Sequence, residues 1–417
     1  MRRPTIHVVG AGFAGLSAAL RLAEAPGAEI VVHDGAAQAG GRRRSFYDEA
    51  TAMTVDGGGE FVLTSWRSTL ALIETIGARD QWRDAAQRGI AFVDMSSGER
   101  WTTRPNAGAL PFWIFNSRRR PPRTRASDYW PALRLQRASP GALLRDYTPG
   151  GGPAAERVWG PFALTALNTR LDRASARLAG AALRETWFGG ARPLAPVHGL
   201  SRDLVEPTLK TLRQRGVTLR LMRRLAALDF DSERVTALEF EHDRIDLAPD
   251  DAVILATPPH VTETLAPGVG APQQFNDAII AHFAISPPDH APSLLGVVNG
   301  VFHWVVSAEG RISVTVKNAA AFMETPREKL AADLWRDVAG LTGLSDTTPA
   351  WRVIRQKRAT FAATPEQDAL RPTLETRWRN LFLAGSYVQN GAPDTLDGSV
   401  RSGVAAADRA GQWVKAF

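Results

Sequence analysis

The sequence predicts an α/β fold in which the first strand of the chain belongs to a parallel sheet. Residues 5–9 form a short apolar stretch typical of a buried strand, and residues 16–25 have the composition of a helix. A second apolar stretch, residues 29–33, ends in Asp34. A strand, a helix and a second strand in this order are typical of a Rossmann-type unit that binds a dinucleotide.

The glycines between the first strand and the helix indicate a phosphate-binding turn. They are Gly10, Gly12 and Gly15, in the order Gly10-Ala11-Gly12-Phe13-Ala14-Gly15. The first glycine permits the tight bend, the second lets the backbone approach a pyrophosphate, and the third lets helix and strand pack closely. The pyrophosphate then lies at the helix N-terminus, where free N–H groups favour negative charge. The carboxylate of Asp34 can hydrogen-bond the ribose hydroxyls, and it disfavours a 2′-phosphate.

A third stretch, Gly40-Gly41-Arg42, narrows the expected cofactor to FAD. It resembles the second half of the fingerprint of FAD-dependent amine oxidases, phytoene-type desaturases and protoporphyrinogen oxidases. The resemblance implies that the two glycines pass close to the cofactor and that Arg42 contacts the pyrophosphate. The chain contains no cysteine, which excludes iron–sulfur clusters, zinc–thiolate sites and a redox dithiol. We therefore expect FAD and no metal.

The C-terminal region predicts the other side of the cofactor site. Residues 381–384 form a short apolar strand that opens into Gly385-Ser386, and a helix is expected from Asp397, with Asp397 as its N-terminal acid or cap. In the families resembled, this helix points its N–H groups at the flavin O2 edge. The residues expected to bind FAD are Gly10, Gly12, Phe13, Ala14, Gly15, Asp34, Gly41, Arg42, Gly58, Gly59, Leu225, Gly385, Ser386, Asp397, Ser399 and Val400.

The FAD-binding unit is predicted to be discontinuous. Residues 252–256, followed by Thr257-Pro258-Pro259, are typical of a strand that returns to the unit, and residues 217–225 are expected to supply the edge near adenine. The fold expected is a Rossmann-type FAD domain of the amine-oxidase and glutathione-reductase-like kind, with an interleaved α+β substrate domain. The FAD domain is expected to comprise residues 1–75, 198–265 and 350–417, and the substrate domain residues 76–197 and 266–349.

Stretches along nearly the whole chain resemble one family in particular. They are Val55–Glu60 with Ser65–Leu70, Ala166–Thr169 with Trp187–Gly190, Lys357–Pro372, and Asn380–Gly385 with Gly391–Pro393 and Asp397–Gly403. The sequence resembles the hydroxysqualene dehydroxylases, or squalene-associated FAD-dependent desaturases, of bacterial hopanoid biosynthesis. The resemblance implies reduction of hydroxysqualene to squalene by reduced FAD. The family more often shows Asn-Gly-Gln-His after the aspartate, so Gly57, Gly59 and Glu60 depart from its pattern, as does Ser386, which replaces an aspartate.

The implied reaction needs a proton donor near the substrate hydroxyl and a dry apolar channel. Glu60 is a candidate donor because a carboxyl in an apolar pocket keeps its proton, and Asp394, in the loop before the last helix, is a second. Aromatic residues are expected around the polyprenyl chain, where their faces could also stabilise a cation. Those expected to line the substrate pocket are Phe112, Trp159, Phe162, Phe283, Phe302 and Trp304.

Other functions stay open at this point. A carotenoid-type desaturase or an amine oxidase would use the same frame, and an amine oxidase generally keeps a lysine near flavin N5, for which Lys317 is the candidate. A flavin-binding structural paralogue without activity is a non-enzymatic alternative. There is no second nucleotide fingerprint, so the electron donor to the flavin is open between free NADPH, a reductase and a quinol.

The charge pattern suggests a membrane surface as partner. The chain carries a net charge of +7 with a pI near 10.2, which also fits a merely arginine-rich composition. Residues 101–145 combine an apolar run with several arginines and aromatics, which is typical of a membrane interface as well as of a solvated basic face. No nucleic-acid-binding module accompanies the charge. No export signal or long apolar segment is evident, so we expect a cytoplasmic protein, with residues 101–145 as a candidate membrane-contacting insertion.

Overall fold

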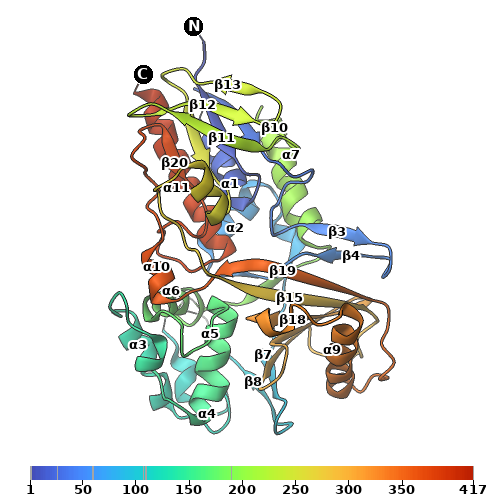
Figure 1. The fold of residues 1–417 in the computed structure, drawn as a ribbon. Helices are drawn as coiled ribbons and strands as arrows, with labels where there is room; N and C mark the ends of the chain where they lie inside the picture. The colour runs from blue at the N-terminus through green and yellow to red at the C-terminus, as the bar shows by residue number, and fades with distance from the viewer. Residues whose placement is uncertain are drawn as a thin grey trace.

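A five-stranded parallel sheet brings the two ends of the chain together, with strand order β10-β2-β1-β14-β20 (Figure 1). The computed structural model describes residues 2–25, 27–58, 61–106, 108, 110–188 and 190–416. The strands of this sheet are β1 (Thr5–Val9), β2 (Glu29–His33), β10 (Thr218–Arg220), β14 (Ala252–Leu255) and β20 (Leu381–Leu383). Four of them confirm strands predicted from apolar runs, which a parallel sheet produces because both of its faces are covered.

Four helices from distant parts of the chain cover this sheet. They are α1 (Phe13–Leu22), α2 (Arg67–Thr75), α7 (Glu206–Gln214) and α11 (Leu396–Lys415). Helices α1 and α11 approach so closely that a Cβ at Gly403 would overlap the carbonyl oxygen of Ala14. The hydroxyl of Ser17 lies at this contact: it donates to the carbonyl of Phe13 in α1 at 2.6 Å and lies 3.2 Å from the carbonyl of Val400 in α11. The predicted N- and C-terminal halves of the cofactor site are therefore fixed to each other.

A small antiparallel sheet lies beside the parallel one and contains β11 (Leu225–Phe230), β12 (Val235–Phe240) and β13 (Arg244–Asp246). Residues 217–225, which are expected to supply the edge near adenine, contain the edge strand β10 of the parallel sheet and the start of β11, and the contact with adenine stays a prediction. The edge strand β10 ends at Arg220, and Leu225 is the buried first residue of a different sheet. A run of apolar residues alone could not reveal the turn between the two strands.

A seven-stranded sheet forms the centre of the other half, with order β19-β15-β18-β17-β16-β7-β8. Its strands are β7 (Ile90–Asp94), β8 (Arg100–Thr103), β15 (Phe275–Ala284), β16 (Leu294–Val298), β17 (Trp304–Ala308), β18 (Arg311–Lys317) and β19 (Trp351–Phe361). One face packs on α9 (Arg327–Thr342). Because β19 pairs with β15 along its length, residues 351–361 belong to this sheet, and the chain goes back to the parallel sheet only after Phe361.

Short helices form a separate layer at the end of the molecule opposite the termini (Figure 1). They are α3 (Pro131–Leu135), α4 (Gly152–Ala154), α5 (Gly160–Leu167) and α6 (Ala176–Thr186), with the 3₁₀ helices η2 (Phe112–Phe115) and η3 (Ala126–Tyr129). The remaining elements connect the halves: β3 (Ser45–Asp48), β4 (Met53–Asp56), β5 (Val62–Leu63), β6 (Trp82–Asp84), β9 (Pro193–Pro196), α8 (Pro259–Leu265) and α10 (Pro365–Ala369). No helix in the described part of the chain is both long and apolar enough to cross a bilayer.

Candidate functional site

The glycine-rich turn after β1 has the geometry that a phosphate group requires. A Cβ at Gly15 would overlap the carbonyl oxygen of Gly10, and a Cβ at Gly10, whose φ is +114°, would overlap that of Ala256. These two glycines are therefore demanded by the packing of the protein itself. A Cβ at Gly12, in contrast, would meet no protein atom within 4 Å. Gly12 is the N-cap of α1, so this open position lies in front of free N–H groups, where a pyrophosphate fits.

The carboxylate of Asp34 ties this turn to the end of β2. One oxygen accepts from the backbone N–H of Ala11 at 2.6 Å, and the other accepts from that of Ala36 at 2.7 Å. Each oxygen keeps a second acceptor position, so these contacts orient the group without using all its capacity. The predicted contact with ribose hydroxyls stays a prediction.

The second glycine pair lies directly against the first turn. The N–H of Gly40 donates to the carbonyl of Ala11 at 2.8 Å. A Cβ at Gly41 would lie 3.2 Å from the Cα of Gly12, and the φ of Gly41 is +57°. The positive φ of Gly41 and its close approach to Gly12 both favour a residue without a side chain. The structure thus places the two parts of the predicted fingerprint in contact.

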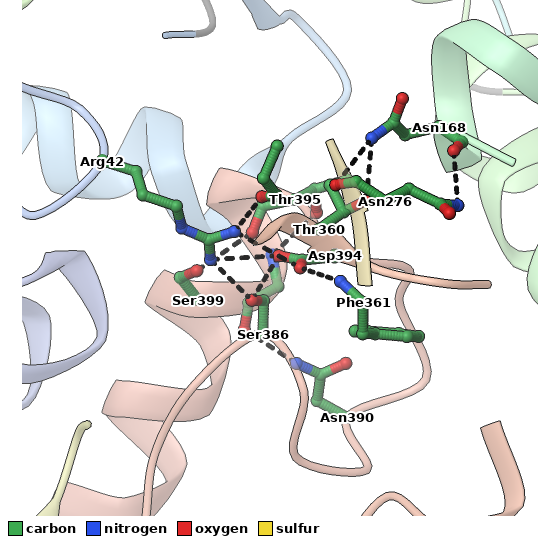
Figure 2. Close-up of polar contacts among 12 residues, drawn as sticks. Arg42, Asn168, Asn276, Thr360, Phe361, Ser386, Asn390, Asp394, Thr395 and Ser399 are labelled. Carbon is green, nitrogen blue, oxygen red and sulfur yellow. Dashed lines mark hydrogen bonds and ion pairs between the residues drawn. The ribbon is translucent and has the colours of Figure 1, made fainter. Parts of the chain in front are cut away.

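Arg42 reaches from this loop to the C-terminal part of the site (Figure 2). Its guanidinium donates to the carbonyl of Ala359 and contacts the hydroxyl of Ser386 at 3.4 Å. It also pairs with the carboxylate of Asp394 at 3.3 Å. The Ser386 hydroxyl in turn donates to Asp394 at 2.5 Å. Three residues predicted separately from distant motifs therefore form one hydrogen-bonded cluster.

The charge state of Asp394 follows from this cluster. Burial by itself would raise the pKa of Asp394, but the charge of Arg42 and hydrogen bonds from Ser386, Arg42 and the Phe361 N–H outweigh it and hold the pKa below its ordinary value. A group held as a carboxylate is a poor proton donor near neutral pH. These contacts favour a role for Asp394 in orienting Arg42 over the predicted role of acid.

Asn168 fixes the strands next to this cluster (Figure 2). Its side-chain amide donates to the hydroxyl of Thr360 at 3.1 Å and its side-chain oxygen accepts from the N–H of Asn318 at 2.7 Å. The side-chain amide of Asn276 donates to the backbone carbonyl of Asn168 at 2.7 Å. Asn168 adopts left-handed backbone angles, with φ of +49°, which asparagine tolerates well. The Ala166–Thr169 stretch marked this residue in the sequence, but its role as a link between β15, β18 and β19 was missed.

Lys317, the lysine considered for an amine oxidase, lies at the end of β18 next to Asn318. Burial and the nearby charge of Arg43 lower its pKa to about 8, while Asp394 opposes this shift. Burial and Arg42 likewise lower the pKa of Arg43 to about 10. Lys317 therefore shares the electrostatic environment of the Arg42, Ser386 and Asp394 cluster.

The start of α11 differs in detail from the prediction. The N-cap is Thr395, whose hydroxyl accepts from the N–H of Gly398 at 3.0 Å. Asp397, predicted as acid or cap of this helix, lies in its first turn, but its carboxylate accepts from the N–H of Thr69 in α2 at 2.8 Å. One acid thus links the N-terminal turns of two helices, because it favours the free N–H groups of both. Ser399 follows in the same turn, and its hydroxyl donates to the Thr395 carbonyl at 3.1 Å.

Glu185 is a buried acid that the sequence analysis missed. It lies in the last turn of α6, where its carbonyl accepts from the Ser65 hydroxyl and its carboxylate lies 3.7 Å from Arg401. Burial and the charge of Asp397 raise the pKa of Glu185 to about 7, against the opposing effect of Arg401. An acid at the C-terminal end of a helix opposes the helix dipole, and this was the available signal.

Aromatic side chains form one cluster beside this acid, although not the one predicted. Trp187 packs on Trp159 and Phe162, with ring centroids 5.1 and 5.7 Å apart, and on Tyr129 and Trp113 at 5.4 and 6.1 Å. Trp159 and Phe162, both predicted for the substrate pocket, are therefore neighbours in this cluster, which includes Trp187 two residues after Glu185. Their contact with a substrate stays a prediction.

The other aromatic residues predicted for the pocket lie elsewhere. Phe283 and Phe302 belong to the core between the seven-stranded sheet and α9, where Phe283 packs on Trp335. Phe112 is on the surface, with 63% of its side chain exposed. Trp304 donates to the hydroxyl of Thr165 in α5 at 3.1 Å. A common pocket for all six residues is wrong, because Phe283 and Phe302 lie in the core beside α9 and Phe112 lies on the surface.

The remaining predicted cofactor residues lie at the edges of the site. Gly58 lies against Gln356 of β19, whose amide donates to the carbonyl of Gly57. The N–H of Gly385 donates to the Ser402 hydroxyl at 3.0 Å, which ties the end of β20 to α11. Gly59 and Glu60 lie outside the described residues, so the predictions for both stay predictions.

Comparison with known proteins agrees with this geometry. The model of the flavin containing amine oxidoreductase family matches residues 13–410. Hydroxysqualene dehydroxylase from Rhodopseudomonas palustris is 41% identical over 408 residues, which cover 97% of each chain. The enzyme of the same name from Sinorhizobium fredii is 42% identical over 97% of this chain and 98% of its own. In fold, the chain is similar to cyclohexylamine oxidase from Brevibacterium oxydans IH-35A, with a TM-score of 0.72 at 14% identity over 99% of this chain and 100% of the other.

Proposed function

Since this chain belongs to the flavin containing amine oxidoreductase family, and within it to the hydroxysqualene dehydroxylases, we propose that it is an FAD-dependent oxidoreductase that reduces hydroxysqualene to squalene. The balanced reaction consumes hydroxysqualene and FADH2 and yields squalene, water and FAD. The observation that carries this proposal is identity above 40% along the whole length of relatives with that name. The product is the precursor of hopanoids.

The residues present fit FAD. Gly12 leaves room for the pyrophosphate at the N-terminus of α1, and Gly41, whose Cβ would lie 3.2 Å from the Cα of Gly12, lets the second loop pass close to the same point. When bound, reduced FAD supplies the hydride that replaces the hydroxyl at carbon. The protein has to hold the substrate carbon in place, exclude water and deliver a proton to the departing oxygen.

Three carboxyl groups are candidates for the source of this proton. Glu60 follows the glycine run and is our first candidate. Asp394 is disfavoured by the contacts that keep it charged. Glu185 is a further candidate, because burial raises its pKa to about 7, its carboxylate lies 3.7 Å from Arg401 of α11, and it precedes Trp187 by two residues. Protonation of the hydroxyl turns it into water, which is a far better leaving group.

The aromatic cluster around Trp187 suits a different step, the stabilisation of the positive charge that remains on the substrate after water has left. Loss of water from an allylic alcohol leaves positive charge spread over carbon, and aromatic faces stabilise such charge. Trp159 is fully buried and Tyr129 nearly so, so water has little access to this region. We assign Trp159, Phe162 and Trp187 to the binding of the polyprenyl chain.

The central experiment is anaerobic mixing of the reduced holoenzyme with hydroxysqualene. We expect one squalene for each flavin reoxidised, followed by absorbance and by gas chromatography of the lipid. Reoxidation without squalene, or no reoxidation, would contradict the proposal. The variants Glu60→Gln and Glu185→Gln are compared in the same assay, and a donor is identified by loss of squalene formation with flavin content unchanged. A wild-type rate in either variant excludes that residue as the acid.

A desaturase or an amine oxidase is the alternative, and the position of Lys317 favours the latter. The same protein with oxidised FAD separates these activities. An amine oxidase would reduce its flavin with a primary amine, and a carotenoid-type desaturase would do so with a polyene precursor. We expect neither substrate to bleach the flavin.

We also propose that the enzyme works in the cytoplasm at a membrane surface, because both substrate and product are long hydrocarbons that partition into lipid. The electron donor that reduces the flavin is not assigned.

A further inference from the structure

Exposed apolar side chains gather in one part of the surface. Of the nine large apolar residues that are strongly exposed in the described chain, five lie between residues 110 and 133. They are Leu110 (58% exposed), Phe112 (63%), Phe115 (71%), Trp130 (65%) and Leu133 (50%). We call these five residues the apolar tip. Isolated exposed apolar residues are common, but a contiguous group in one segment usually marks an interaction surface.

Helix geometry places four of these side chains in two pairs, each on one side of a short helix. Phe112 and Phe115 are three residues apart in the 3₁₀ helix η2, and with three residues per turn they lie on the same side of it. Trp130 and Leu133 are likewise three residues apart at the start of α3. Between the two phenylalanines, Trp113 points inward and is 96% buried. Each short helix therefore has an outer apolar face and an inner anchored one.

The segment is held in place by its own hydrogen bonds. Arg120 donates to the carbonyl of Thr124 at 2.9 Å and to that of Ile114 at 2.8 Å. The Thr124 hydroxyl donates to the carbonyl of Pro121 at 2.6 Å. The backbone N–H of Trp113 donates to the side-chain oxygen of Asn106 at 2.9 Å. The apolar tip is thus presented by a fixed frame, which lowers the entropy lost when it inserts into a partner.

The charge of the protein is concentrated in the same segment. Residues 101–145 contain nine arginines and a single acidic residue, a net charge of +8 against +7 for the whole chain. The exposed arginines are Arg104, Arg118, Arg123, Arg125, Arg134, Arg137 and Arg145. Arg123 has an acidic neighbour just outside the segment, Glu99 at 3.4 Å. The rest of the chain is close to neutral, so an arginine-rich composition does not explain this distribution.

We propose that the apolar tip and its arginines dock this enzyme on an anionic lipid bilayer, from which hydroxysqualene passes directly to the aromatic cluster. Exposed apolar side chains and exposed cations in the same segment fit the boundary between acyl chains and acidic headgroups. Trp113 connects the two regions, because it lies between Phe112 and Phe115 and packs on Tyr129 and Trp187. The proposal rests on the proposed function for the identity of the lipid substrate, but not for the docking itself.

Docking is tested by sedimentation of the FAD-loaded full chain with vesicles of phosphatidylglycerol and phosphatidylcholine, and with phosphatidylcholine alone. We expect strong binding to the anionic vesicles, weaker binding to the neutral ones, and a decrease with salt for the anionic vesicles. The double variant Phe115→Ser/Trp130→Ser should bind about tenfold or more weakly. The matched control Tyr47→Ser/Leu370→Ser removes two exposed apolar residues elsewhere, 64% and 41% exposed, and should bind as the wild type does.

Several outcomes would overturn docking. Equal loss of binding in both double variants would mean that general surface hydrophobicity, and not this tip, is responsible. If the wild type bound to neither kind of vesicle, a lipid bilayer would be excluded as the partner of the apolar tip. A dimer in light scattering that the Phe115→Ser/Trp130→Ser variant dissolves would show that a second copy covers the tip.

Delivery of the substrate is tested separately. Squalene formation is measured with hydroxysqualene dispersed in detergent and with hydroxysqualene carried in anionic vesicles. We expect the Phe115→Ser/Trp130→Ser variant to retain its rate in detergent and to lose most of it on vesicles. Equal rates of the variant and the wild type on vesicles would overturn delivery through the tip. If the wild type formed no squalene in detergent and none on vesicles, the proposed function would be refuted. The sedimentation result would still decide whether the apolar tip binds the bilayer.

Discussion

Replacement of Gly12 by alanine should separate the needs of the cofactor from the needs of the fold. The backbone angles of Gly12, φ −78° and ψ 175°, are ordinary for alanine. A methyl group there would meet no protein atom within 4 Å. The apoprotein should therefore fold normally. It should even gain about 0.4–1 kcal/mol in unfolding free energy, because alanine restricts the unfolded chain more than glycine does.

Binding of FAD should nevertheless fall sharply in this variant. The new methyl group occupies the space in front of the N-terminus of α1, where the pyrophosphate accepts hydrogen bonds from backbone N–H groups. A hydrogen bond to a charged group contributes about 1.5–3 kcal/mol, so loss of two weakens binding by about 3–6 kcal/mol. The Kd for FAD should rise roughly 100-fold to 20,000-fold.

The assay titrates apoprotein with FAD by fluorescence quenching and follows thermal unfolding of the apoprotein in parallel. Gly15→Ala is the control, since its Cβ would overlap the carbonyl of Gly10 and should reduce both stability and FAD binding. A Gly12→Ala protein that binds FAD within a factor of about three of the wild type would refute the placement of the pyrophosphate at this turn.

Three further predictions concern buried charges. Arg157→Leu should lower the unfolding free energy, measured in urea, by about 3–5 kcal/mol. The carboxylate of Asp94 lies 2.9 Å from Arg157 and is only 3% exposed, so the variant leaves a buried charge without its cation. A loss below about 1 kcal/mol would show that the pair is not effectively buried. Asp394→Asn should destabilise the protein by about 1–3 kcal/mol at neutral pH, and because the folded pKa of Asp394 is lowered, its contribution is present above the ordinary pKa and is lost as the pH falls through the folded value. Wild type and variant should therefore converge in acid, and a constant difference would argue against a charged Asp394. For Glu185 the sign is opposite: its pKa is raised from 4.5 to about 7, so the stability it confers is present below 4.5 and is lost as the pH rises through 7, by about 3 kcal/mol in all. Glu185→Gln should abolish this pH dependence in urea melts, and an unchanged slope would place the titration elsewhere.

The sequence alone determined the part of the protein that depends on local backbone geometry. Gly10, Gly15 and Gly41 occupy positions where a side chain would clash or where φ is positive, so the nucleotide-binding fingerprint had to be visible in the residues themselves. Four of the five strands of the parallel sheet were equally visible, since burial on both faces produces uninterrupted apolar runs. The family resemblance followed from motifs of the same kind.

The tertiary structure decided what depends on distant partners. Asp394 is kept ionised by Arg42, 352 residues away, and no local pattern contains that neighbour. Phe283 and Trp159 are both buried aromatic residues, and only the course of the seven-stranded sheet placed them in different cores. Backbone rules act over a few residues and can be read from the chain. Ionisation and shared pockets depend on which segments meet in space, and for this reason only the fold could assign them.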